Sequence, residues 1–513
     1  MIAASARASA GGSRALVTIC VMLATIMQAL DTSIANVALP HMQGSLQATQ
    51  DQIAWVLTSY IVAAAIATPL TGWLAGRFGR KRLFVVSVIG FTVASLFCGL
   101  AETLAQMVFY RLMQGLFGAA LIPLSQATLL DVYPRERHGA AMAIWGSGIV
   151  VAPILGPTLG GYLTDAYTWR WVFFINLPVG ILTVVGIALF VAETKLDRAR
   201  PFDFFGFAML SLFIGALQMM LDRGETNDWF GSTETWVELG LAITGIWVFL
   251  VHAATAEHPF VSLALFKDRN FVAGSVLMFL IGILLYGTLA LLPPLLQQLM
   301  DYPVVTTGLV LGPRGFGTLV AMAVVGRLTG KIDARLLLGV GFAVTAYSLW
   351  RMTAYSLDMD MWPVVTITIL QGFGLGMVWV PLSTASFYTL PVHLRTEGSA
   401  FSSLVRNIGG SIGIAVGETV LVRNIQINHA SIAEHVNPYN PMMQIPSVHH
   451  AWNMNTLSGL SALNAEVTRQ AAMIAYLDVF KLLMLLTIAL IPLLLMLRDT
   501  RGAAQSGPAP ALD

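Results

Sequence analysis

The stretch Ile26–Pro40 reads IMQALDTSIANVALP and places one carboxylate, Asp31, inside a long apolar run. An ionisable side chain costs several kcal/mol in the hydrocarbon core of a membrane, so Asp31 is a candidate functional residue. The whole chain shares this apolar character. Of its 513 residues, 56% are hydrophobic and 11% are charged, and the mean hydropathy is +0.74. Soluble proteins carry about 25% charged residues. We therefore predict an all-α integral membrane protein.

Fourteen apolar runs are long enough to span a membrane, which takes about 20 residues each. They cover residues 15–38, 53–75, 83–101, 105–130, 140–163, 172–192, 204–221, 236–255, 271–297, 306–328, 336–355, 362–388, 400–422 and 473–496. An even number of crossings puts both termini on one side. Nineteen of the 28 Lys and Arg residues lie at the termini and in the loops of that side, against five in the opposite loops. Because cytoplasmic loops are enriched in Lys and Arg, we predict that both termini are cytoplasmic.

Two sequence patterns occur in both the early and the late part of the chain. GWLAGRFGRKRLF at 72–84 matches GRLTGKIDARLLL at 326–338, and the QG…PLS pattern at 114–125 recurs at 371–383. Each repeated pattern occurs at the same position within a set of six helices if the seventh and eighth helices are left out of the count. The predicted architecture is thus six plus two plus six helices. Such repeats are typical of secondary transporters, whose sites lie near the membrane midplane between the repeats.

The domain boundaries follow from this repeat. We predict an N-terminal half over residues 1–192, two extra linker helices over 193–258 and a C-terminal half over 259–500. Within the last, residues 424–472 are polar and are predicted to form a periplasmic loop. Residues 501–513 are predicted to be a disordered cytoplasmic tail.

Several motifs resemble those of a known transporter family. GWLAGRFGRKR resembles the loop motif of the major facilitator superfamily, RLMQG at 111–115 its fourth-helix motif, and GPTLGG at 156–161 its fifth-helix antiporter motif. With LDTSIANVALP, WRWVFFINLPVG and VNPYNP, nearly the whole chain is similar to the EmrB-like, fourteen-helix drug:proton antiporters. The loop motif usually has an acid where this chain has Gly76, which puts the charge-relay role of that acid in question.

The resemblance implies a multidrug exporter in the bacterial inner membrane. It would exchange protons for hydrophobic or amphiphilic drugs and toxic compounds, and so confer antibiotic resistance. Its partners would be an EmrA-like periplasmic adaptor and a TolC-like outer-membrane channel, with residues 424–472 as the candidate adaptor contact. No Walker-type sequence is present, so we expect no cofactor and no ATP, only the proton-motive force. The net charge of +1 indicates no nucleic-acid partner.

Two opposite charges are predicted at the same membrane depth. At 1.5 Å per residue, Asp31 lies about 13 Å inward of Pro40, and Arg111 lies about 12 Å inward of Thr103 on a helix that runs the other way. Charges in lipid pair or face a wet cavity. We predict that Asp31 carries the proton and that Arg111 tunes it, the alternative being a static ion pair. Glu418 is a second protonation candidate, or else an interfacial residue that reaches water.

Further polar side chains inside the spans either line a substrate cavity or join helices. They are Gln28, Asn36, Gln114, Gln126, Gln371 and Asn407. Arg314 and Arg406 lie among small residues. We predict that they attract anionic substrate groups or pair with acids in the cavity, the alternative being hydrogen bonds to backbone carbonyls or an interfacial position. Thr368 stands where the repeat would place the counterpart of Arg111, so proton chemistry is expected mainly in the first half.

Two groups of motif residues complete the predicted sites. The antiporter motif comprises Gly148, Gly156, Pro157, Gly160 and Gly161, which we predict form a tight helix interface that governs the conformational switch. The cytoplasmic loop motif comprises Gly72, Arg77, Gly79, Arg80 and Lys81, and we predict that its basic residues clamp helix ends and lipid head groups. The alternative for the glycines is generic helix packing.

Other functional classes remain as alternatives. A proton-independent or proton-linked transporter of a specific metabolite or siderophore would share the fold, and a channel would conduct without counterflow. An enzyme would need a clustered catalytic set. The histidines lie in loops or near span ends, and we predict no metal site and no enzymatic activity.

Overall fold

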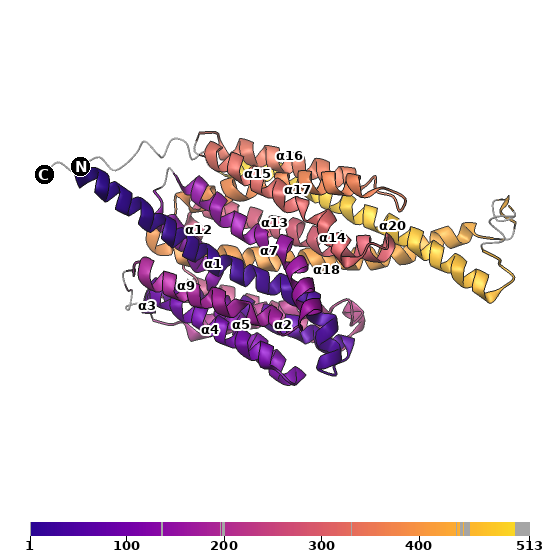
Figure 1. Cartoon of the computed structure of the whole chain (residues 1–513), viewed down its shortest axis with the longest axis horizontal. Coiled ribbons are helices and arrows are strands. Elements are labelled where there is room, and N and C mark those ends of the chain that lie inside the picture. The colour runs from indigo at the N-terminus through magenta and orange to yellow at the C-terminus, as the bar shows by residue number, and fades with distance from the viewer. Residues whose placement is uncertain are drawn as a thin grey trace.

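A computed structural model describes residues 2–134, 137–194, 196, 201–329, 331–437, 439–441, 445 and 452–497. Over this part of the chain the secondary structure is helical, with a single isolated β-bridge between Thr329 and Ile332. The long helices run along the longest axis of the molecule (Figure 1). The predicted tail 501–513 lies outside the described residues.

The helices fall into three consecutive groups. The N-terminal half contains α1 (Ile2–Ser45), α2 (Gln50–Ala67), α3 (Leu70–Phe78), α4 (Arg80–Leu100), α5 (Leu104–Gly118), α6 (Leu121–Val132), α7 (His138–Ala166), α8 (Trp171–Phe174) and α9 (Asn176–Phe190). The linker contains α10 (Phe204–Arg223), η2 (Trp229–Gly231) and α11 (Thr233–Thr255). The C-terminal half contains α12 (Ala264–Lys267), α13 (Arg269–Pro294), η3 (Leu295–Leu299), α14 (Val304–Leu311), α15 (Pro313–Leu328), α16 (Ala334–Met352), α17 (Met361–Tyr388), η4 (Val392–Leu394), α18 (Arg395–His435), α20 (Leu457–Leu490) and η6 (Ile491–Met496).

Most of these helices are apolar enough to cross a membrane. Among the described residues, eleven helical stretches are long and apolar enough to cross a membrane. Helices α2 and α3, which meet at a bend of 57°, form a twelfth candidate span if they are counted together. Helices α7 and α16 are not among these candidate spans, but they coincide with the predicted apolar runs 140–163 and 336–355. The structure is therefore compatible with the fourteen predicted crossings. Helices suit this environment because they satisfy their own backbone hydrogen bonds in lipid.

Polar residues mark the helix starts. The side chain of Thr49 caps α2 in a capping box, and Thr103, Asp268 and Thr456 cap α5, α13 and α20 by accepting from backbone N–H groups of the first turn. Such caps satisfy N–H groups that have no partner within the helix. The turn at the end of α3 requires glycine, because Gly79 has a φ of +94°.

The predicted periplasmic loop 424–472 is wrong as a loop, because most of it is helical. Helix α18 continues to His435 and α20 begins at Leu457, so both project beyond the other helices (Figure 1). Asn424 donates to Asp478 at 3.1 Å and His429 lies 3.0 Å from Asn464, which ties the two helices together. A polar sequence indicates that a segment lies outside the lipid, but it does not indicate that the helix ends there. Residues 438, 442–444 and 446–451 lie outside the described residues.

Two helices carry most of the contact between the halves. Helix α7 packs on α1 of its own half and on α15 and α17 of the other, and α18 packs on α13 and α20 and also on α3 and α6. Linker helix α10 packs on α11, α2 and α18. We call the end with Gly79 and Arg395 the inner end, because the basic loops gather there, and the end with Ser45 and His435 the outer end.

Candidate functional site

A buried polar network surrounds Asp31 on α1. Arg111 Nη1 on α5 donates to Asp31 Oδ2 at 2.7 Å. Gln114 Nε2 and Asn176 Nδ2 donate to Asp31 Oδ1 at 2.8 and 2.9 Å. Asp31 is 2% exposed, and Arg111 and Gln114 are 0% exposed. The predicted pairing of Asp31 with Arg111 is therefore present in the structure.

The network is held from several sides. Arg111 Nη1 also donates to Gln114 Oε1 at 2.8 Å, and Arg111 Nε donates to the Val56 carbonyl of α2 at 3.1 Å. The guanidinium carbon lies 4.3 Å from the centroid of the Tyr60 ring, which adds a cation–π contact. Asn176 Nδ2 reaches Ser95 Oγ of α4 at 3.0 Å. Helices α1, α2, α4, α5 and α9 thus meet around one carboxylate.

The chemistry of this network follows from its donors and acceptors. Every hydrogen-bond partner of the Asp31 carboxylate among the described residues is an N–H donor, so the arrangement suits the ionised acid. A protonated carboxyl carries an O–H that needs an acceptor, and none of these three groups can accept it in this geometry. Protonation therefore requires at least one partner to move away.

Sequence reasoning missed Asn176 and Ser95. Both lie inside predicted apolar runs, as Gln28 and Gln114 do, so the criterion of a polar group within a span would have found Asn176. Gln114 was predicted as a cavity or helix-joining residue, and it joins helices within this network.

A second cluster of charges closes the inner end. The carboxylate of Asp131, at the end of α6, accepts from Arg80 at the start of α4 and from Arg395 Nη1 at the start of α18, the latter at 2.8 Å. Arg80 Nη2 also donates to Thr396 Oγ1 at 2.9 Å. The two arginine side chains are 8% and 5% exposed. We call this cluster the inner latch (Arg80, Asp131, Arg395 and Thr396), since it joins the two halves.

The sequence repeat corresponds to a matching pair of contacts at the inner end. A Cβ on Gly72 would lie 2.9 Å from the Glu397 Cα of α18, and a Cβ on Gly326 would lie 2.9 Å from the Ala143 Cβ of α7. Each glycine thus lets the second helix of its half approach the start of the fifth helix of the other half. The halves are closed against each other at this end.

The remaining loop-motif residues hold the start of α4. The Glu193 carboxylate accepts from the backbone N–H groups of Lys81 and Arg82 at 3.0 and 3.3 Å. A Cβ on Gly79 would lie 2.5 Å from Glu193 Oε1, so this anion also requires glycine at the turn. An anion at a helix N-terminus is stabilised by the helix dipole. Arg77 is exposed.

The antiporter-motif glycines differ in what they contact. A Cβ on Gly156 would lie 2.5 Å from the Ser33 Cβ of α1, and a Cβ on Gly160 would lie 3.2 Å from Ile34 Cγ2. Ser33 and Ile34 lie two and three residues after Asp31 on α1, so α7 lies against the helix of the acid. A Cβ on Gly148 would lie 2.4 Å from the flexible end of Met22 and 3.4 Å from Ile26 Cγ1.

Gly161 does not fit the predicted tight interface, because a Cβ there would meet nothing within 4 Å. The motif places it next to Gly160, but successive helix positions point about 100° apart and only one of them faces α1. The Pro157 side chain lies outside the described residues.

We expect Gly156→Ala to lower export about tenfold, because the new Cβ would push α1 and with it Asp31. Overpacking of this kind costs about 1–3 kcal/mol. Gly161→Ala is the matched control, since it makes the same chemical change where there is open space, and it should retain export. Uptake of a fluorescent substrate into everted vesicles measures both. Equal activity of the two variants would contradict this role for Gly156.

The other predicted cavity residues are dispersed. Gln28 Oε1 accepts from the Ile122 backbone N–H at 3.2 Å, and Asn36 is exposed on α1. Ser399 Oγ of α18 donates to Gln126 Oε1 of α6 at 2.5 Å, just inside the inner latch. Gln371 is 1% exposed, and its Oε1 has no hydrogen-bond partner among the described residues.

Arg314 and Arg406, the two arginines predicted for the cavity, lack carboxylate partners among the described residues. Arg314 Nη2 donates to Thr288 Oγ1 at 3.1 Å. Arg406 is 5% exposed and lies with its guanidinium carbon 5.3 Å from the Trp379 ring centroid. Its Nη2 is 3.5 Å from Asn407 Oδ1. Pairing with cavity acids, one of the predicted alternatives, does not occur here.

Glu418 is separate from the Asp31 network. It is exposed on α18 in the other half, and the acids Asp222 and Glu225 near the outer end repel its charge. Within the described part of the chain no ion pair forms at Glu418.

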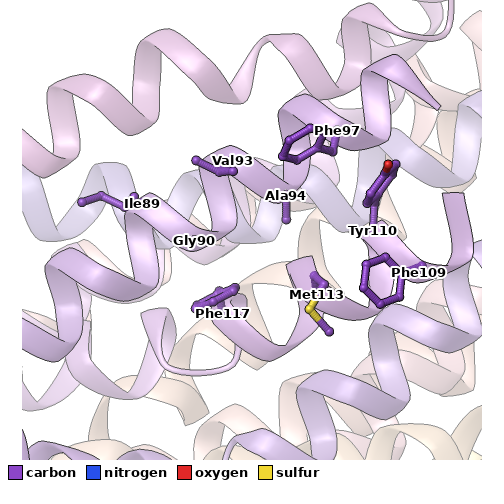
Figure 2. Close-up of a pocket in the computed structure, with 9 residues that line it drawn as sticks. All are labelled: Ile89, Gly90, Val93, Ala94, Phe97, Phe109, Tyr110, Met113 and Phe117. Atoms are coloured by element: carbon purple, nitrogen blue, oxygen red, sulfur yellow. The ribbon is translucent and has the colours of Figure 1, made fainter. Parts of the chain in front are cut away.

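An apolar groove of about 370 Å³ lies between α4 and α5 (Figure 2). Its lining residues are Ile89, Gly90, Val93, Ala94, Phe97, Phe109, Tyr110, Met113 and Phe117. Several of them are exposed, and none is charged. The groove therefore lies on the lipid-facing side of α5, away from the face that carries Arg111 and Gln114.

Comparison with known proteins agrees with this architecture. The model of the Major Facilitator Superfamily matches residues 21–414. Two solved structures share the fold: the proton:xylose symporter XylE, with a TM-score of 0.60 at 14% identity over 96% of this chain and 97% of that one, and the human organic anion transporter MFSD10, with a TM-score of 0.58 at 14% identity over 92% and 99%.

Curated relatives are much more similar in sequence. Multidrug export protein EmrB of Haemophilus influenzae is 37% identical over 92% of this chain and 93% of its own. EmrB of Escherichia coli K12 is 39% identical over 85% of each. Fatty acid resistance protein FarB of Neisseria gonorrhoeae is 37% identical over 94% and 96%. The chain is therefore a multi-pass membrane transporter that belongs to the major facilitator superfamily, among its EmrB-like multidrug exporters.

Proposed function

We propose that this protein is a proton-coupled antiporter that exports hydrophobic and amphiphilic compounds across a bacterial inner membrane. The single observation that carries the proposal is the Asp31 carboxylate, buried at 2% exposure and surrounded by N–H donors. The names of the relatives, which include multidrug export and fatty acid resistance, support a substrate class of small molecules with large apolar parts. The proton-motive force drives export, without ATP or a cofactor.

Proton binding would act directly on helix packing. A protonated Asp31 no longer attracts Arg111 by charge and needs an acceptor for its new O–H. Arg111 and Asn176 would then be released from the acid, and these residues lie on α5 and α9. The packing of α1 against α5 and α9 would loosen when Asp31 is protonated and tighten when Asp31 is ionised.

The contact between the halves at the inner end would be the part of the structure that this change reaches. Helix α7 lies against α1 through Gly156 and against α15 near the inner end through Gly326. A shift of α1 at Asp31 would thus be passed to the contact between halves. Alternating access by rocking of one half against the other is the general mechanism of such repeats.

The projecting ends of α18 and α20 are the proposed contact for an EmrA-like periplasmic adaptor, which would connect to a TolC-like outer-membrane channel. They extend beyond the rest of the bundle as a tied helix pair (Figure 1). Replacing residues 428–470 with a short Gly/Ser linker should abolish capture of such an adaptor in a pull-down and leave the protein in the membrane. Unchanged capture would contradict this assignment.

Proton coupling is tested in everted vesicles that contain the protein. With a pH gradient, acid inside, we expect a lipophilic dye to accumulate above its level in vesicles without the protein. Collapse of the gradient with nigericin should remove the accumulation, whereas ATP alone should not restore it. A protein that carries the dye equally well without a gradient would instead be the proton-independent transporter of a metabolite or siderophore.

A further inference from the structure

Three buried N–H donors of one cluster have no acceptor among the described residues. They are Trp145 Nε1 on α7, Trp379 Nε1 on α17 and Arg406 Nε on α18. The three residues are 1%, 7% and 5% exposed. Buried donors are nearly always hydrogen-bonded, so three neighbouring N–H groups without an acceptor need an explanation. We call Trp145, Trp379 and Arg406 the donor cluster.

The donor cluster lies between the two halves. The Trp145 and Trp379 ring centroids are 6.3 Å apart, and Arg406 lies over the Trp379 ring. A Cβ on Gly146 would lie 3.1 Å from Trp379 Cδ1, so the edge of the indole that carries Nε1 faces α7. Substrate sites of this architecture lie between the repeats near the midplane. The donors therefore become accessible when the halves separate.

Among the residues that the structure describes, no carboxylate forms an ion pair with Arg406. Helix α17 carries no Asp or Glu, and on α7 the only acid is Asp165, twenty residues from Trp145. On α18 the nearest acid to Arg406 is Glu397, nine residues and about 13 Å away along the helix. Glu397 accepts from the Ser262 backbone N–H at 2.5 Å.

Arg314 adds a second cation on the outer side of the cluster. The Arg406 backbone lies against Gly282 of α13, and Arg314 reaches Thr288 of the same helix. These two positions are six residues apart, which is about 9 Å along the helix. Both guanidiniums thus lie on the C-terminal half, one nearer the centre and one nearer the outer end.

We infer that the donor cluster binds the carboxylate or sulfonate head of an amphipathic monoanion when the halves separate. A guanidinium binds such oxyanions with charge-assisted hydrogen bonds, and two indole N–H groups supply neutral donors. The rings of Trp145 and Trp379 and the neighbouring Met322 offer an adaptable surface for the apolar body. The inference rests on the proposed export function and names the substrate charge that its central site prefers.

The test uses two substrates of equal chain length, decanesulfonate and decyltrimethylammonium, in proteoliposomes with a pH gradient. The sulfonate does not cross lipid as a neutral acid, so its transport reports the protein. We expect the wild type to export decanesulfonate, and Arg406→Gln to lower kcat/KM for it at least about tenfold, since a charge-assisted bond is lost. Any transport of the ammonium compound should change less than about twofold.

Further variants separate binding from structure. Trp379→Phe keeps the ring and removes one donor, and should lower transport of the sulfonate only. Arg406→Lys should restore part of it. Arg351→Gln, which removes an exposed guanidinium on α16, is the matched control and should change neither substrate. A merely structural role for Arg406 would lower both substrates equally, and that result, or unchanged sulfonate transport in Arg406→Gln, would overturn the inference.

The outcomes also separate this inference from the proposed function. A wild type that exports the ammonium compound but not the sulfonate would overturn the anion site and leave proton-coupled export standing. A wild type that exports the sulfonate without a pH gradient would support the anion site and contradict proton coupling. Export of neither compound would contradict both.

Discussion

Asp31→Asn is expected to abolish proton-driven accumulation of substrate, with a loss of at least about 100-fold. Asparagine has nearly the same shape as aspartate but cannot bind and release a proton. Its amide oxygen can still accept from Arg111, Gln114 or Asn176, so much of the hydrogen-bonded geometry at α1 remains available. Accumulation in everted vesicles with a pH gradient measures the effect.

The same variant leaves the Arg111 charge without its counter-ion at 0% exposure. Removal of one partner of a buried pair costs about 3–5 kcal/mol, so folding must be measured separately. Substrate counterflow, which needs no net proton movement, provides that control. We expect Asp31→Asn to retain counterflow and lose accumulation. Accumulation at the wild-type level would show that the ion pair is static.

Asp131→Asn is expected to open the inner end. Asp131 is the carboxylate that Arg80 and Arg395 share, and both guanidiniums are largely buried. Loss of its charge leaves two cations close together without an anion, at a cost of about 3 kcal/mol or more. That shifts the equilibrium between closed and open inner ends by about 100-fold.

Spin labels report this opening as a distance. Cysteines at the exposed inner-end positions Arg82 and Arg327 would carry the labels, with the buried Cys20 and Cys98 replaced by alanine. The distance between labels should lengthen in Asp131→Asn. The matched control is Glu234→Gln, which breaks the exposed pair with Arg223, worth about 0–1 kcal/mol, and should leave the distance unchanged. An unchanged distance in Asp131→Asn would remove the latch from the mechanism.

The sequence predicted the Asp31–Arg111 pair because helix rise places charges at a calculable depth. The same reasoning did not include Asn176 among the amides inside spans, although this amide completes the acid's hydrogen bonds. It also did not predict the inner latch, in which Asp131 and Arg395 are 264 residues apart. Depth along a helix follows from residue number, whereas the facing side of a helix follows only from packing.

The repeat was more informative than any single motif. It assigned Gly72 and Gly326 to the same place in the two six-helix sets, and the structure places each against the start of the opposite half's fifth helix. The antiporter motif, by contrast, grouped Gly156 with Gly161, and only Gly156 approaches α1 closely. In the 424–472 region, polarity was mistaken for absence of helix, because a helix outside lipid needs no apolar surface.

The most direct test of the account is proton release on substrate binding by the purified protein. In weakly buffered solution, addition of a tightly bound substrate to the wild type should release protons in proportion to the protein, and the same addition to Asp31→Asn should release none. Binding itself, followed by tryptophan fluorescence in the same samples, should persist in the variant. Equal proton release from wild type and Asp31→Asn would contradict the assignment of Asp31 as the proton carrier.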